Sequence, residues 1–386
     1  FAEQKRPHTG TPSLHYKNRL ERTHYPMATA QHKPFKTYPL LRPLAWVYRQ
    51  VMRQRNNRFD DGRLKTEAFG LPVISVGNIS VGGTGKTPMC AYLLELLCNT
   101  GHSPALLSRG YGRTTKGFRK VTSAATAATV GDEPLELYKR HRGTVAVYVC
   151  EDRCEGAHRI IAENNGTDVL VLDDAYQHRY IDRDLNIMLT DCNRLYTRDK
   201  VMPEGRLRED LSGAKRADVV IVTKCRPDMT EGQATAIRNE LGLQPCQQLF
   251  FTTIKYAAPT SPYPDTRTEE SATSLKNAKV LVFTGIANPT SLTGHYSHRC
   301  ASVKTLAFGD HHAFSSNDIR HIAEAAADAD IVITTAKDFQ RLPLDLPQSL
   351  KQKLLVQHIS VGFLFDQQEQ FNDIVRLTID KYKTEP

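Results

Sequence analysis

Short runs of apolar and β-branched residues recur along most of this chain, and stretches with helical spacing of apolar side chains separate many of them. The runs fall at residues 73–77, 104–108, 144–149, 168–172, 185–190, 217–223, 279–284, 302–307, 330–335 and 353–357. Runs of this length and composition indicate buried strands. Because strands that alternate with helices usually pair in parallel, the pattern predicts an α/β fold with a doubly wound, mostly parallel sheet.

A stretch rich in Thr, Ser and Pro divides the predicted strands into two groups. We therefore expect two lobes, of which the C-terminal α/β lobe is the smaller. The predicted parts are an irregular arm at 1–39, an amphipathic helix at 40–59, a core at 60–257, a linker at 258–277 and a C-terminal lobe at 278–386. Met27 heads a stretch that reads like an ordinary protein start, so residues 1–26 are interpreted as upstream sequence and left out of the fold prediction.

Residues 40–58 have the pattern of a basic amphipathic helix. One side carries Leu40, Leu44, Val47, Tyr48, Val51 and Met52, the other carries Arg49, Gln50, Arg53 and Gln54, and Trp46 lies near the apolar side. Such a helix can lie in the headgroup layer of a membrane with its arginines on lipid phosphates. It can equally pack on its own domain and leave a solvated outer face. The absence of acidic residues between Glu21 and Asp60 favours the membrane.

The formal net charge of +9 is concentrated at one end of the chain. Residues 1–66 contain 14 Lys and Arg against four Asp and Glu, a net charge of +10 that leaves the remainder at −1. We therefore expect no nucleic-acid partner, but an anionic surface met at that end. No feature calls for an obligate protein partner, and no apolar run approaches the roughly 20 residues that span a bilayer. The eight cysteines form no CxxC pair and are expected as reduced thiols.

A glycine-rich loop follows the first predicted strand and precedes a helical pattern. It consists of Ser80, Val81, Gly82, Gly83, Thr84, Gly85, Lys86 and Thr87. Strand, glycine loop and helix in this order are the context of a P-loop, in which backbone N–H groups and the helix N-terminus hold phosphates. Lys86 would reach the β- and γ-phosphates, and the Thr87 hydroxyl would bind Mg²⁺. The general P-loop pattern has Gly where this chain has Ser80.

Asp173 and Asp174 follow the apolar run 168–172 in the form of a Walker-B pair. A buried strand that delivers a carboxylate beside a P-loop supplies Mg²⁺ ligands, directly or through water. The sequence therefore predicts a magnesium site at these two residues. A guanine-reading loop would have the form [NT]KxD, but here Arg226 stands where that pattern needs Asp. The predicted nucleotide is therefore ATP.

Further polar clusters lie in loops next to the predicted strands. They contain Arg109, Tyr111, Arg113, Asp132, Glu133, Gln177, His178, Arg208, Glu209, His311 and His312. Each residue alone fits a structural role, such as a helix cap or a solvated loop. Loops at strand ends are also where α/β enzymes build their sites, and the set as a whole favours a catalytic site.

Several short motifs are similar, in order, to the landmarks of the lipid A 4'-kinases (tetraacyldisaccharide 4'-kinases). They are SVGN-x-x-VGGTGKTP, LLSRGYGR, VGDEP, LDDAYQH, GRLRE, FTGIANP, FGDHHAF and TTAKDFQRL, and the resemblance runs from about residue 40 to 380. It implies a kinase that uses Mg-ATP to phosphorylate the 4'-hydroxyl of a tetraacyl glucosamine disaccharide 1-phosphate. It also implies a peripheral location on the cytoplasmic face of the inner membrane of a Gram-negative bacterium.

The resemblance further implies roles for individual residues. Asp132 matches the family's proposed base and His311 its partner; Ser80 to Thr87 match the ATP site; Asp173, Asp174, Gln177 and His178 match the cluster near metal and nucleotide; Arg208 and Glu209 match a charged pair near the phosphates. The chain departs from the family at Ala175-Tyr176 and at Asp210. These departures bear on loop shape and substrate fit rather than on the reaction.

The mechanism expected from this resemblance is in-line transfer of the γ-phosphoryl group. Asp132, predicted on one lobe, accepts the sugar hydroxyl proton, and His311, predicted on the other lobe, orients that carboxylate. Arg113 and Arg208 are candidates for the sugar-side phosphate or the transferring group. Two alternatives stay open: a P-loop ATPase that acts as a switch or delivers a metal, and a kinase for a soluble small-molecule acceptor.

Overall fold

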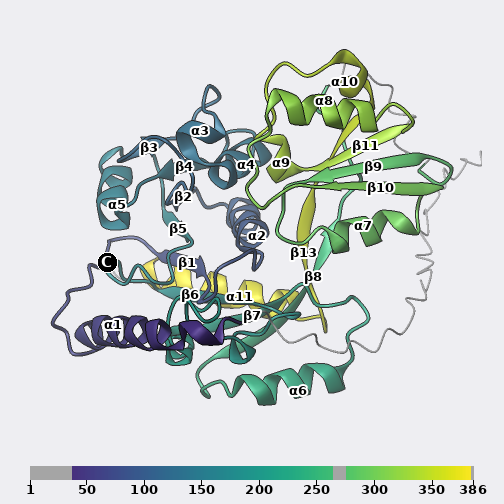
Figure 1. Cartoon of the computed structure of the whole chain (residues 1–386). Helices are drawn as coiled ribbons and strands as arrows, with labels where there is room; N and C mark the ends of the chain where they lie inside the picture. The colour runs from purple at the N-terminus through teal and green to yellow at the C-terminus, as the bar shows by residue number, and fades with distance from the viewer. Residues whose placement is uncertain (1–36, 264–274, 384–386) are drawn as a thin grey trace, which may run out of the picture. The chain divides into compact units, whose positions relative to one another are not determined.

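The described part of the chain contains two β-sheets, one of nine strands and one of four. The computed structural model describes residues 37–263 and 275–383 (Figure 1). A single compact unit begins at Thr37. Most of the predicted arm at 1–39 and the middle of the predicted linker lie outside the described residues.

Helices and strands alternate along most of the chain, as the apolar runs predicted. Up to the end of the first lobe they are η1 (Pro39–Leu41), α1 (Arg42–Asp60), β1 (Val73–Gly77), α2 (Lys86–Asn99), β2 (Pro104–Ser108), β3 (Arg119–Lys120), α3 (Ala127–Val130), α4 (Asp132–Arg140), β4 (Ala146–Val149), α5 (Arg153–Ala162), β5 (Val169–Asp173), β6 (Leu185–Asp191), η2 (Tyr196–Arg198), η3 (Leu211–Arg216), β7 (Val219–Thr223), α6 (Glu231–Leu241) and β8 (Gln248–Tyr256). After the linker they are β9 (Lys279–Thr284), α7 (Thr290–Ser297), β10 (Ser302–Ala307), α8 (Ser316–Ala325), β11 (Ile331–Thr335), α9 (Ala336–Phe339), α10 (Gln348–Lys353), β12 (Leu354–Gln357), β13 (Ile359–Phe363), α11 (Gln368–Asp380) and η6 (Lys381–Lys383).

Strand β1 lies at the centre of the large sheet, between β5 and β6. The strand order is β13, β8, β7, β6, β1, β5, β2, β4 and β3. Neighbouring strands are parallel except at the two edges, where β13 and β3 run antiparallel to β8 and β4. The chain first builds the sheet on one side of β1 and then continues on the other. The carboxyl ends of β1 and its neighbours therefore form the switch point at which open α/β sheets bind ligands.

Both faces of the large sheet are covered by helices, because its side chains alternate between the faces. One face, with Ile74 and Val171, packs against α2, α4 and α11. The opposite face, with Leu107 and Leu172, packs against α5, and further along it Val220 packs against α6. The doubly wound sheet is thus present as predicted.

The small sheet is an entirely parallel sheet with the order β10, β9, β11 and β12. Helices α8 and α10 contribute to the core on one of its faces, which contains Phe283 and Val332. Helix α7 contributes Leu292 and Tyr296 to the core on the other face. This is the smaller α/β lobe that the sequence predicted.

Strands β8 and β13 join the two sheets. Strand β12 ends in the small sheet, and one residue later β13 pairs antiparallel with β8 in the large sheet. The Ala257 amide donates a hydrogen bond to the His358 carbonyl at 3.1 Å where the two chain segments meet. Helix α11 then buries Phe371 and Val375 in the core of the large sheet. The predicted C-terminal lobe of 278–386 is therefore too long, because residues from 359 onward complete the first lobe.

Helix α1 is present where the amphipathic pattern predicted it, but its most apolar side does not face the core. It buries Ala45 and Phe59. Leu44, Val47 and Val51 are 60%, 52% and 57% exposed. The helix thus packs on its own lobe through a largely polar side and leaves apolar side chains in solvent.

Polar contacts hold α1 in this orientation. The Tyr48 hydroxyl donates to the Arg208 carbonyl at 2.8 Å, and Asn56 Nδ2 donates to Glu209 Oε2 at 2.9 Å. Arg53 Nη2 lies 2.5 Å from Asp210 Oδ2. Tyr48, predicted on the exposed apolar side, is therefore half-buried against the GRLRE segment. No helix among the described residues is both long and apolar enough to cross a membrane.

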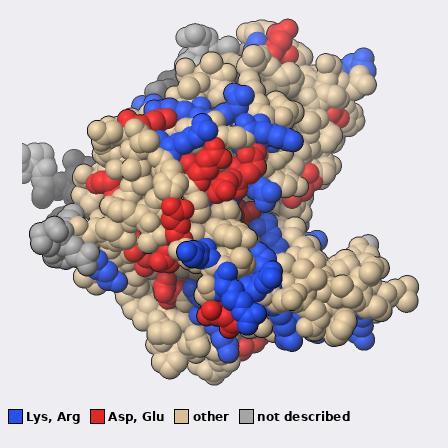
Figure 2. Space-filling model, turned by 90° about the vertical axis from the view of Figure 1, so that its left-hand side faces the viewer, with Lys and Arg blue, Asp and Glu red and all other residues tan. Residues whose placement is uncertain are grey.

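Charged side chains of both signs share one face of the molecule. Figure 2 shows Asp and Glu gathered at the centre of that face, with Lys and Arg above and below them. The basic residues of the described chain thus do not form a continuous surface on this side.

Candidate functional site

The predicted P-loop lies at the carboxyl end of the central strand β1 and leads into α2, which begins at Lys86. Gly82 and Gly85 have φ angles of +116° and +90°, in the region that favours glycine. Ser80 forms an antiparallel β-bridge with Leu207 and does not have a positive φ angle. Its backbone conformation therefore suits a residue with a side chain, which explains why Gly is not needed at this point of the loop.

Residues beyond the loop hold it in shape. Asn78 Nδ2 donates to Thr84 Oγ1 at 2.6 Å, and the Thr223 hydroxyl donates to the Thr84 carbonyl at 2.8 Å. Lys224 Nζ contacts the Gly83 carbonyl and lies 2.8 Å from Asp191 Oδ2. Thr223 and Lys224, which stand where a guanine-reading [NT]KxD motif would begin, thus hold the P-loop in place from the end of β7.

Asp173 ends strand β5 beside β1 and is buried. Ser108 Oγ donates to Asp173 Oδ2 at 3.0 Å, and Cys90 Sγ lies 3.6 Å from Asp173 Oδ1. Burial, together with the negative charges of Glu133 and Asp174, raises the pKa of Asp173 to about 6. A cation bound at Asp173 would offset the repulsion between these neighbouring negative charges.

Asp174 has φ +48° and forms ion pairs with two cations. Lys86 Nζ lies 3.6 Å from Asp174 Oδ1, and Arg208 donates to both carboxylate oxygens, at 2.8 and 3.2 Å. Burial alone would raise the pKa of Asp174, but the charges of Lys86 and Arg208 outweigh burial and lower it. The predicted Walker-B pair therefore contains one crowded and one well-paired carboxylate.

Gln177 and Glu209 extend this network toward α1. Gln177 Nε2 donates to the Asn78 carbonyl at 2.8 Å and to Glu209 Oε1 at 3.0 Å. Arg216 Nη2 donates to both oxygens of the buried Glu209, at 2.9 and 2.8 Å. Both residues thus hold the segment 206–209 against the P-loop rather than projecting into open space.

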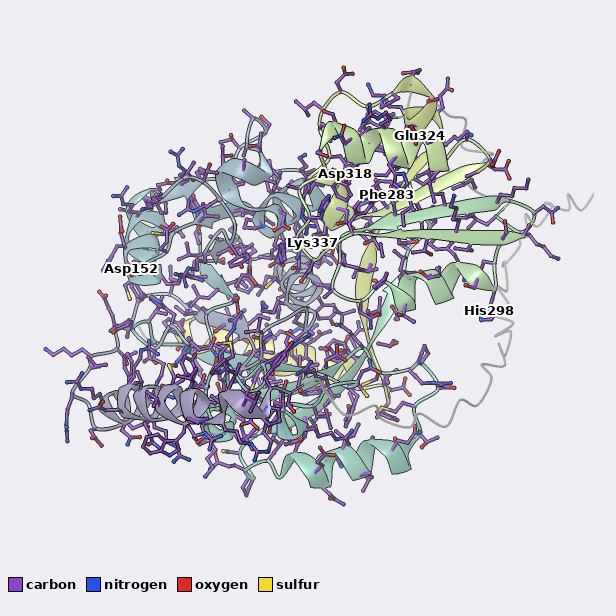
Figure 3. All side chains as sticks on the ribbon, viewed as in Figure 1. Asp152, Phe283, His298, Asp318, Glu324 and Lys337 are labelled. Atoms are coloured by element: carbon purple, nitrogen blue, oxygen red, sulfur yellow. The ribbon has the colours of Figure 1, made fainter. Side chains whose placement is uncertain are left out.

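Asp132 and His311 meet as the resemblance implied, although they lie in different lobes. Asp132 is the first residue of α4, and His311 Nδ1 lies 3.1 Å from its Oδ2. Arg341, from the C-terminal lobe, places Nη2 2.5 Å and Nε 2.7 Å from the same oxygen. Lys337, labelled in Figure 3, lies 2.7 Å from Glu133 Oε1 and 3.3 Å from His311 Nε2. Five side chains, two from α4 and three from the second lobe, thus form one charged cluster.

The cluster keeps the Asp132 carboxylate ionised. Burial raises the pKa of Asp132, but the hydrogen bond with His311 and the charges of Lys337 and Arg341 outweigh it and hold the pKa well below its ordinary value. Burial lowers the pKa of Lys337, but the charges of Glu133 and Asp132 outweigh burial and raise it. Because an ammonium group can only donate, the 3.3 Å contact of Lys337 with His311 Nε2 fits the tautomer with its hydrogen on Nδ1, from which it would donate a hydrogen bond to Asp132 Oδ2.

Three of these site residues have unusual backbone angles. Seven described non-glycine residues have positive φ angles, and three of them lie here: Asp174, Lys224 and His311, with values of 48°, 57° and 57°. Such conformations cost energy and persist where the surrounding structure enforces them, which is often at functional sites. Asp174 belongs to the Walker-B pair, Lys224 contacts the P-loop at Gly83, and His311 belongs to the charged cluster around Asp132.

The remaining predicted residues are less closely engaged with the P-loop. Arg113 donates to Glu151 Oε1 at 2.7 Å and to the Gly117 carbonyl at 2.7 Å, with a side chain that is 2% exposed. Tyr111 is exposed and packs edge-on against His311 with ring centroids 5.5 Å apart. Arg109 is exposed. The Arg113 guanidinium is inaccessible to solvent, so it is not presented to a substrate phosphate in this conformation.

His178, which the resemblance assigned to the Walker-B cluster, makes its contacts with the start of α5. The Arg153 amide donates to His178 Nε2 at 3.4 Å, and Asp152 Oδ1 lies 3.9 Å from that nitrogen. Burial and the nearby Arg153 charge lower the pKa of His178 to about 4. The imidazole is thus neutral at physiological pH and braces α5 against the loop after β5.

Sequence reasoning missed the basic residues that complete the acceptor side. Lys337 and Arg341 belong to the TTAKDFQRL motif, which was recognised without a role for either residue. Asp338, from the same motif, is buried and accepts from Thr284 Oγ1 at 2.6 Å and from Arg341 Nη1 at 3.1 Å. Lys337 lies on the four-residue helix α9, and Arg341 follows two residues after its end. A short run of alternating charges is a weak signal in a sequence, and only the fold shows that these two side chains face Asp132.

The residues present fit a magnesium ion. The Thr87 side chain makes no hydrogen bond with any other described residue, so its hydroxyl oxygen remains available. One hydroxyl and two carboxylates are hard oxygen donors of the kind that Mg²⁺ prefers beside a nucleotide. The crowded carboxylate of Asp173 supplies the negative charge that such an ion would neutralise.

A P-loop with a carboxylate pair is common to ATPases and kinases, but the second lobe adds something that an ATPase does not need. It delivers a histidine and two basic residues to a buried aspartate near the loop, an arrangement suited to an acceptor hydroxyl. The fold and site therefore define a P-loop kinase. A family model described as tetraacyldisaccharide-1-P 4'-kinase matches residues 37–379, and the chain belongs to that family.

Relatives and a solved structure agree with this assignment. The chain is 40% identical over 347 residues to the tetraacyldisaccharide 4'-kinase of Bacteroides fragilis, with 87% of this chain and 92% of that protein covered. It is 37% identical over 350 residues to the enzyme of the same name from Cytophaga hutchinsonii, with 89% and 96% covered. It also resembles the crystal structure of LpxK from Aquifex aeolicus in complex with ATP, with TM-score 0.67, 25% identity, and 88% of this chain and 99% of that chain covered.

Proposed function

We propose that this protein transfers the γ-phosphoryl group of ATP to the 4'-hydroxyl of tetraacyldisaccharide 1-phosphate, giving the 1,4'-bisphosphate in lipid A biosynthesis. The observation that carries the proposal is the Asp132–His311 contact of 3.1 Å, in a chain whose family is defined by this reaction. In the reaction, a bond forms between the 4'-oxygen and the γ-phosphorus, and the bond from that phosphorus to the β,γ-bridging oxygen breaks. The hydroxyl proton passes to the enzyme, and ADP leaves.

The P-loop side of the site binds ATP. Backbone N–H groups from Gly82 to Lys86 and the N-terminus of α2 surround the phosphates, and the Lys86 ammonium neutralises charge on the β- and γ-phosphates. Asp174 holds Lys86 in place through the 3.6 Å ion pair. A Mg²⁺ ion held by Thr87 together with Asp173 or Asp174 would neutralise phosphate charge and help to orient the transferring group.

The acceptor side positions the sugar hydroxyl. Asp132 accepts the hydroxyl hydrogen bond and then the proton, with His311 and Arg341 fixing the orientation of its carboxylate. The low pKa of Asp132 does not exclude this role, because phosphoryl transfer has a loose transition state and depends mainly on positioning and electrostatics. A carboxylate kept fully ionised at neutral pH is always ready to orient the nucleophile.

The membrane side of the proposal rests on α1. Its exposed Leu44, Val47 and Val51, with Trp46 beside them, would enter the acyl boundary of the cytoplasmic face of the inner membrane. Arg58, exposed on the same helix, would face anionic lipid headgroups. Since the acceptor carries four acyl chains that cost about 0.8 kcal/mol per CH₂ to withdraw from lipid, the enzyme must meet it there.

The test is transfer of label from γ-labelled ATP to tetraacyldisaccharide 1-phosphate in mixed detergent micelles with Mg²⁺. Labelled lipid from the native protein and none from the Lys86→Ala variant would support the proposal. ATP hydrolysis without labelled lipid would overturn it in favour of an ATPase switch. Label that appears in a soluble acceptor, and that the lipid does not compete away, would favour the soluble-acceptor kinase.

A further inference from the structure

Arg206 is an exposed arginine whose guanidinium lies at the P-loop. A Cβ atom built on Gly82 would be 3.7 Å from Arg206 Nη1. Arg206 is exposed, and its side chain forms no ion pair or hydrogen bond with any other residue that the structure describes. An unpaired guanidinium beside a phosphate-binding loop has the geometry and charge to bind a phosphate.

The backbone on both sides fixes Arg206 relative to the loop. The Val81 amide donates to the Arg206 carbonyl at 2.8 Å, and the Arg208 amide donates to the Ile79 carbonyl at 2.7 Å. The Arg206 amide itself donates to Asp199 Oδ1 at 3.2 Å. Residues 206–208 therefore run antiparallel to residues 79–81, and the start of the P-loop cannot move without carrying Arg206 with it.

A tight turn precedes Arg206. A Cβ atom on Gly205 would clash with the Lys200 carbonyl oxygen and would lie 2.6 Å from Asp199 Oδ1. No side chain fits at this position, so the turn requires glycine. The path of the chain into Arg206 is thus set by local packing rather than by a loose surface loop.

The direction of Arg206 follows from its neighbours. Side chains two residues apart in an extended segment lie on the same face, so Arg206 and Arg208 share a face while the buried Leu207 lies on the other. Arg208 reaches Asp174, whose carboxylate lies 3.6 Å from Lys86 Nζ. Arg206 thus emerges on the side of the loop from which Lys86 reaches the β- and γ-phosphates.

The other arginines that the sequence offered for this task are already committed. Arg208 donates to both oxygens of Asp174, and Arg113 is buried against Glu151. Turning either guanidinium toward a phosphate would first break these ion pairs, whereas Arg206 has none to break with any described residue.

We propose that Arg206 binds the γ-phosphate of ATP and stabilises the charge of the transferring phosphoryl group. It is then an arginine finger supplied by the same chain. This inference rests on the proposed function only in that the nucleotide is ATP, because the contact is made to the γ-phosphate whatever the acceptor. The residue joins Lys86 on the donor side, across the transferring group from Asp132.

Nucleotide binding tests the contact without any acceptor. Calorimetric affinities for ADP and for the imido analogue of ATP, both with Mg²⁺, are compared between the native protein and Arg206→Ala. The expected result is an affinity for the analogue about tenfold weaker in Arg206→Ala with the ADP affinity unchanged, and partial recovery in Arg206→Lys. Arg119→Ala is the matched control, since Arg119 is exposed and its side chain forms no hydrogen bond or ion pair with a described residue. Equal effects on both nucleotides, or none, would overturn the proposal.

Turnover supplies the second readout. Arg206→Ala is expected to lower kcat on the order of 10²-fold, the loss typical of one transition-state donor, with the KM for the lipid unchanged. Native transfer to the lipid together with an unchanged kcat in Arg206→Ala would overturn the role of Arg206 and leave the proposed function intact. Absence of lipid transfer by the native protein would overturn the proposed function, while the nucleotide comparison would still decide whether Arg206 reads the γ-phosphate.

Discussion

Arg341 and Asp132 are 209 positions apart in the sequence, yet Arg341 Nη2 lies 2.5 Å from Asp132 Oδ2. The two side chains belong to different lobes, and both are nearly inaccessible to solvent. The contact makes the protonation state of the proposed acceptor-side carboxylate depend on the C-terminal lobe. A residue far from the P-loop in sequence thus controls the chemistry beside it.

Removal of Arg341 should shift the acid limb of the pH–rate profile. The Arg341 charge stabilises the ionised form of Asp132, so Arg341→Ala should raise the pKa of Asp132 by about 1 to 3 units. Because Asp132 must be ionised to accept a proton, its contribution to the acid limb of kcat, measured at saturating Mg²⁺ so that Asp173 stays ionised, should move to higher pH. Arg341→Lys should shift it less. A variant that loses activity equally at every pH would show that Arg341 is merely structural.

Replacement of Asp132 should separate chemistry from nucleotide binding. Asp132→Asn should lower kcat by about 10²- to 10⁴-fold, the usual contribution of a general base, while ATP affinity stays near native. Lys86→Ala should weaken ATP binding as well. Near-native turnover in Asp132→Asn would remove Asp132 from the mechanism.

The same variant should show a particular dependence of stability on pH. The pKa of Asp132 is lower in the folded protein than its ordinary value of 3.8, so its ion pairs stabilise the fold fully above that value and this stabilisation is lost as pH falls below it. The difference in unfolding free energy between native protein and Asp132→Asn should therefore be constant from about pH 7 to pH 5 and shrink in more acidic buffer. Denaturant melts at a series of pH values measure it. A difference that already disappears between pH 7 and pH 5 would contradict the assignment.

The affinity for Mg²⁺ should fall in mildly acidic buffer. The pKa of Asp173 is raised to about 6, so this carboxylate becomes neutral as pH falls through that value and loses its attraction for a cation. Chelation of Mg²⁺ should abolish turnover, and the apparent Mg²⁺ affinity should fall by about tenfold per pH unit below about pH 6. Asp173→Asn serves as the control. ATP itself is protonated to the same extent in both experiments, but the variant lacks the carboxylate that titrates. An identical pH dependence in both proteins would exclude Asp173 as a ligand.

Polar substitutions on the exposed side of α1 should detach the protein from liposomes without unfolding it. Leu44→Gln, Val47→Gln and Val51→Gln remove apolar surface worth roughly 1 kcal/mol each, about 10²-fold in partitioning together. Flotation with anionic vesicles should fall accordingly, and the melting temperature should change little because these side chains are already exposed. Leu344→Gln with Leu377→Gln is the matched control, since both residues are exposed elsewhere. Equal flotation of all variants would exclude α1 as the membrane contact.

The sequence predicted the strands that are buried on both faces, because these appear as uninterrupted apolar runs. Strands β1, β2 and β9, which are largely buried, begin and end where the pattern placed them. Strand β10, a more exposed edge strand, also has the predicted bounds. Strands β8 and β13 were missed. In β8, Thr252 and Thr253 interrupt the run of apolar side chains, and β13 follows β12 after a single residue. Without these two strands the return of α11 to the first lobe cannot be seen, which is why the C-terminal boundary was wrong.

The site could be predicted as far as local motifs reach. A P-loop and an acidic pair after a strand are recognisable because their function depends on neighbours in sequence. Arg341 and Lys337 act on Asp132 and Glu133 across the fold, and no local pattern records that contact. The orientation of α1 was hidden for a related reason. Its apolar stripe is plain in sequence, but the polar partners that anchor the opposite side, such as Glu209, lie more than 150 positions away.

The antiparallel pairing of β8 with β13 makes the C-terminal lobe an insertion into an otherwise complete nucleotide-binding sheet. The chain departs after Tyr256 and returns at Ile359, and these two residues are direct partners in the sheet. A hairpin turn of two to five residues would therefore close the gap geometrically. The shortened protein would retain the P-loop and the Walker-B pair but lose His311, Lys337 and Arg341. Gene fusion or deletion at this one hairpin position would therefore add or remove the residues that the C-terminal lobe contributes to the Asp132 cluster, and would leave the rest of the sheet intact.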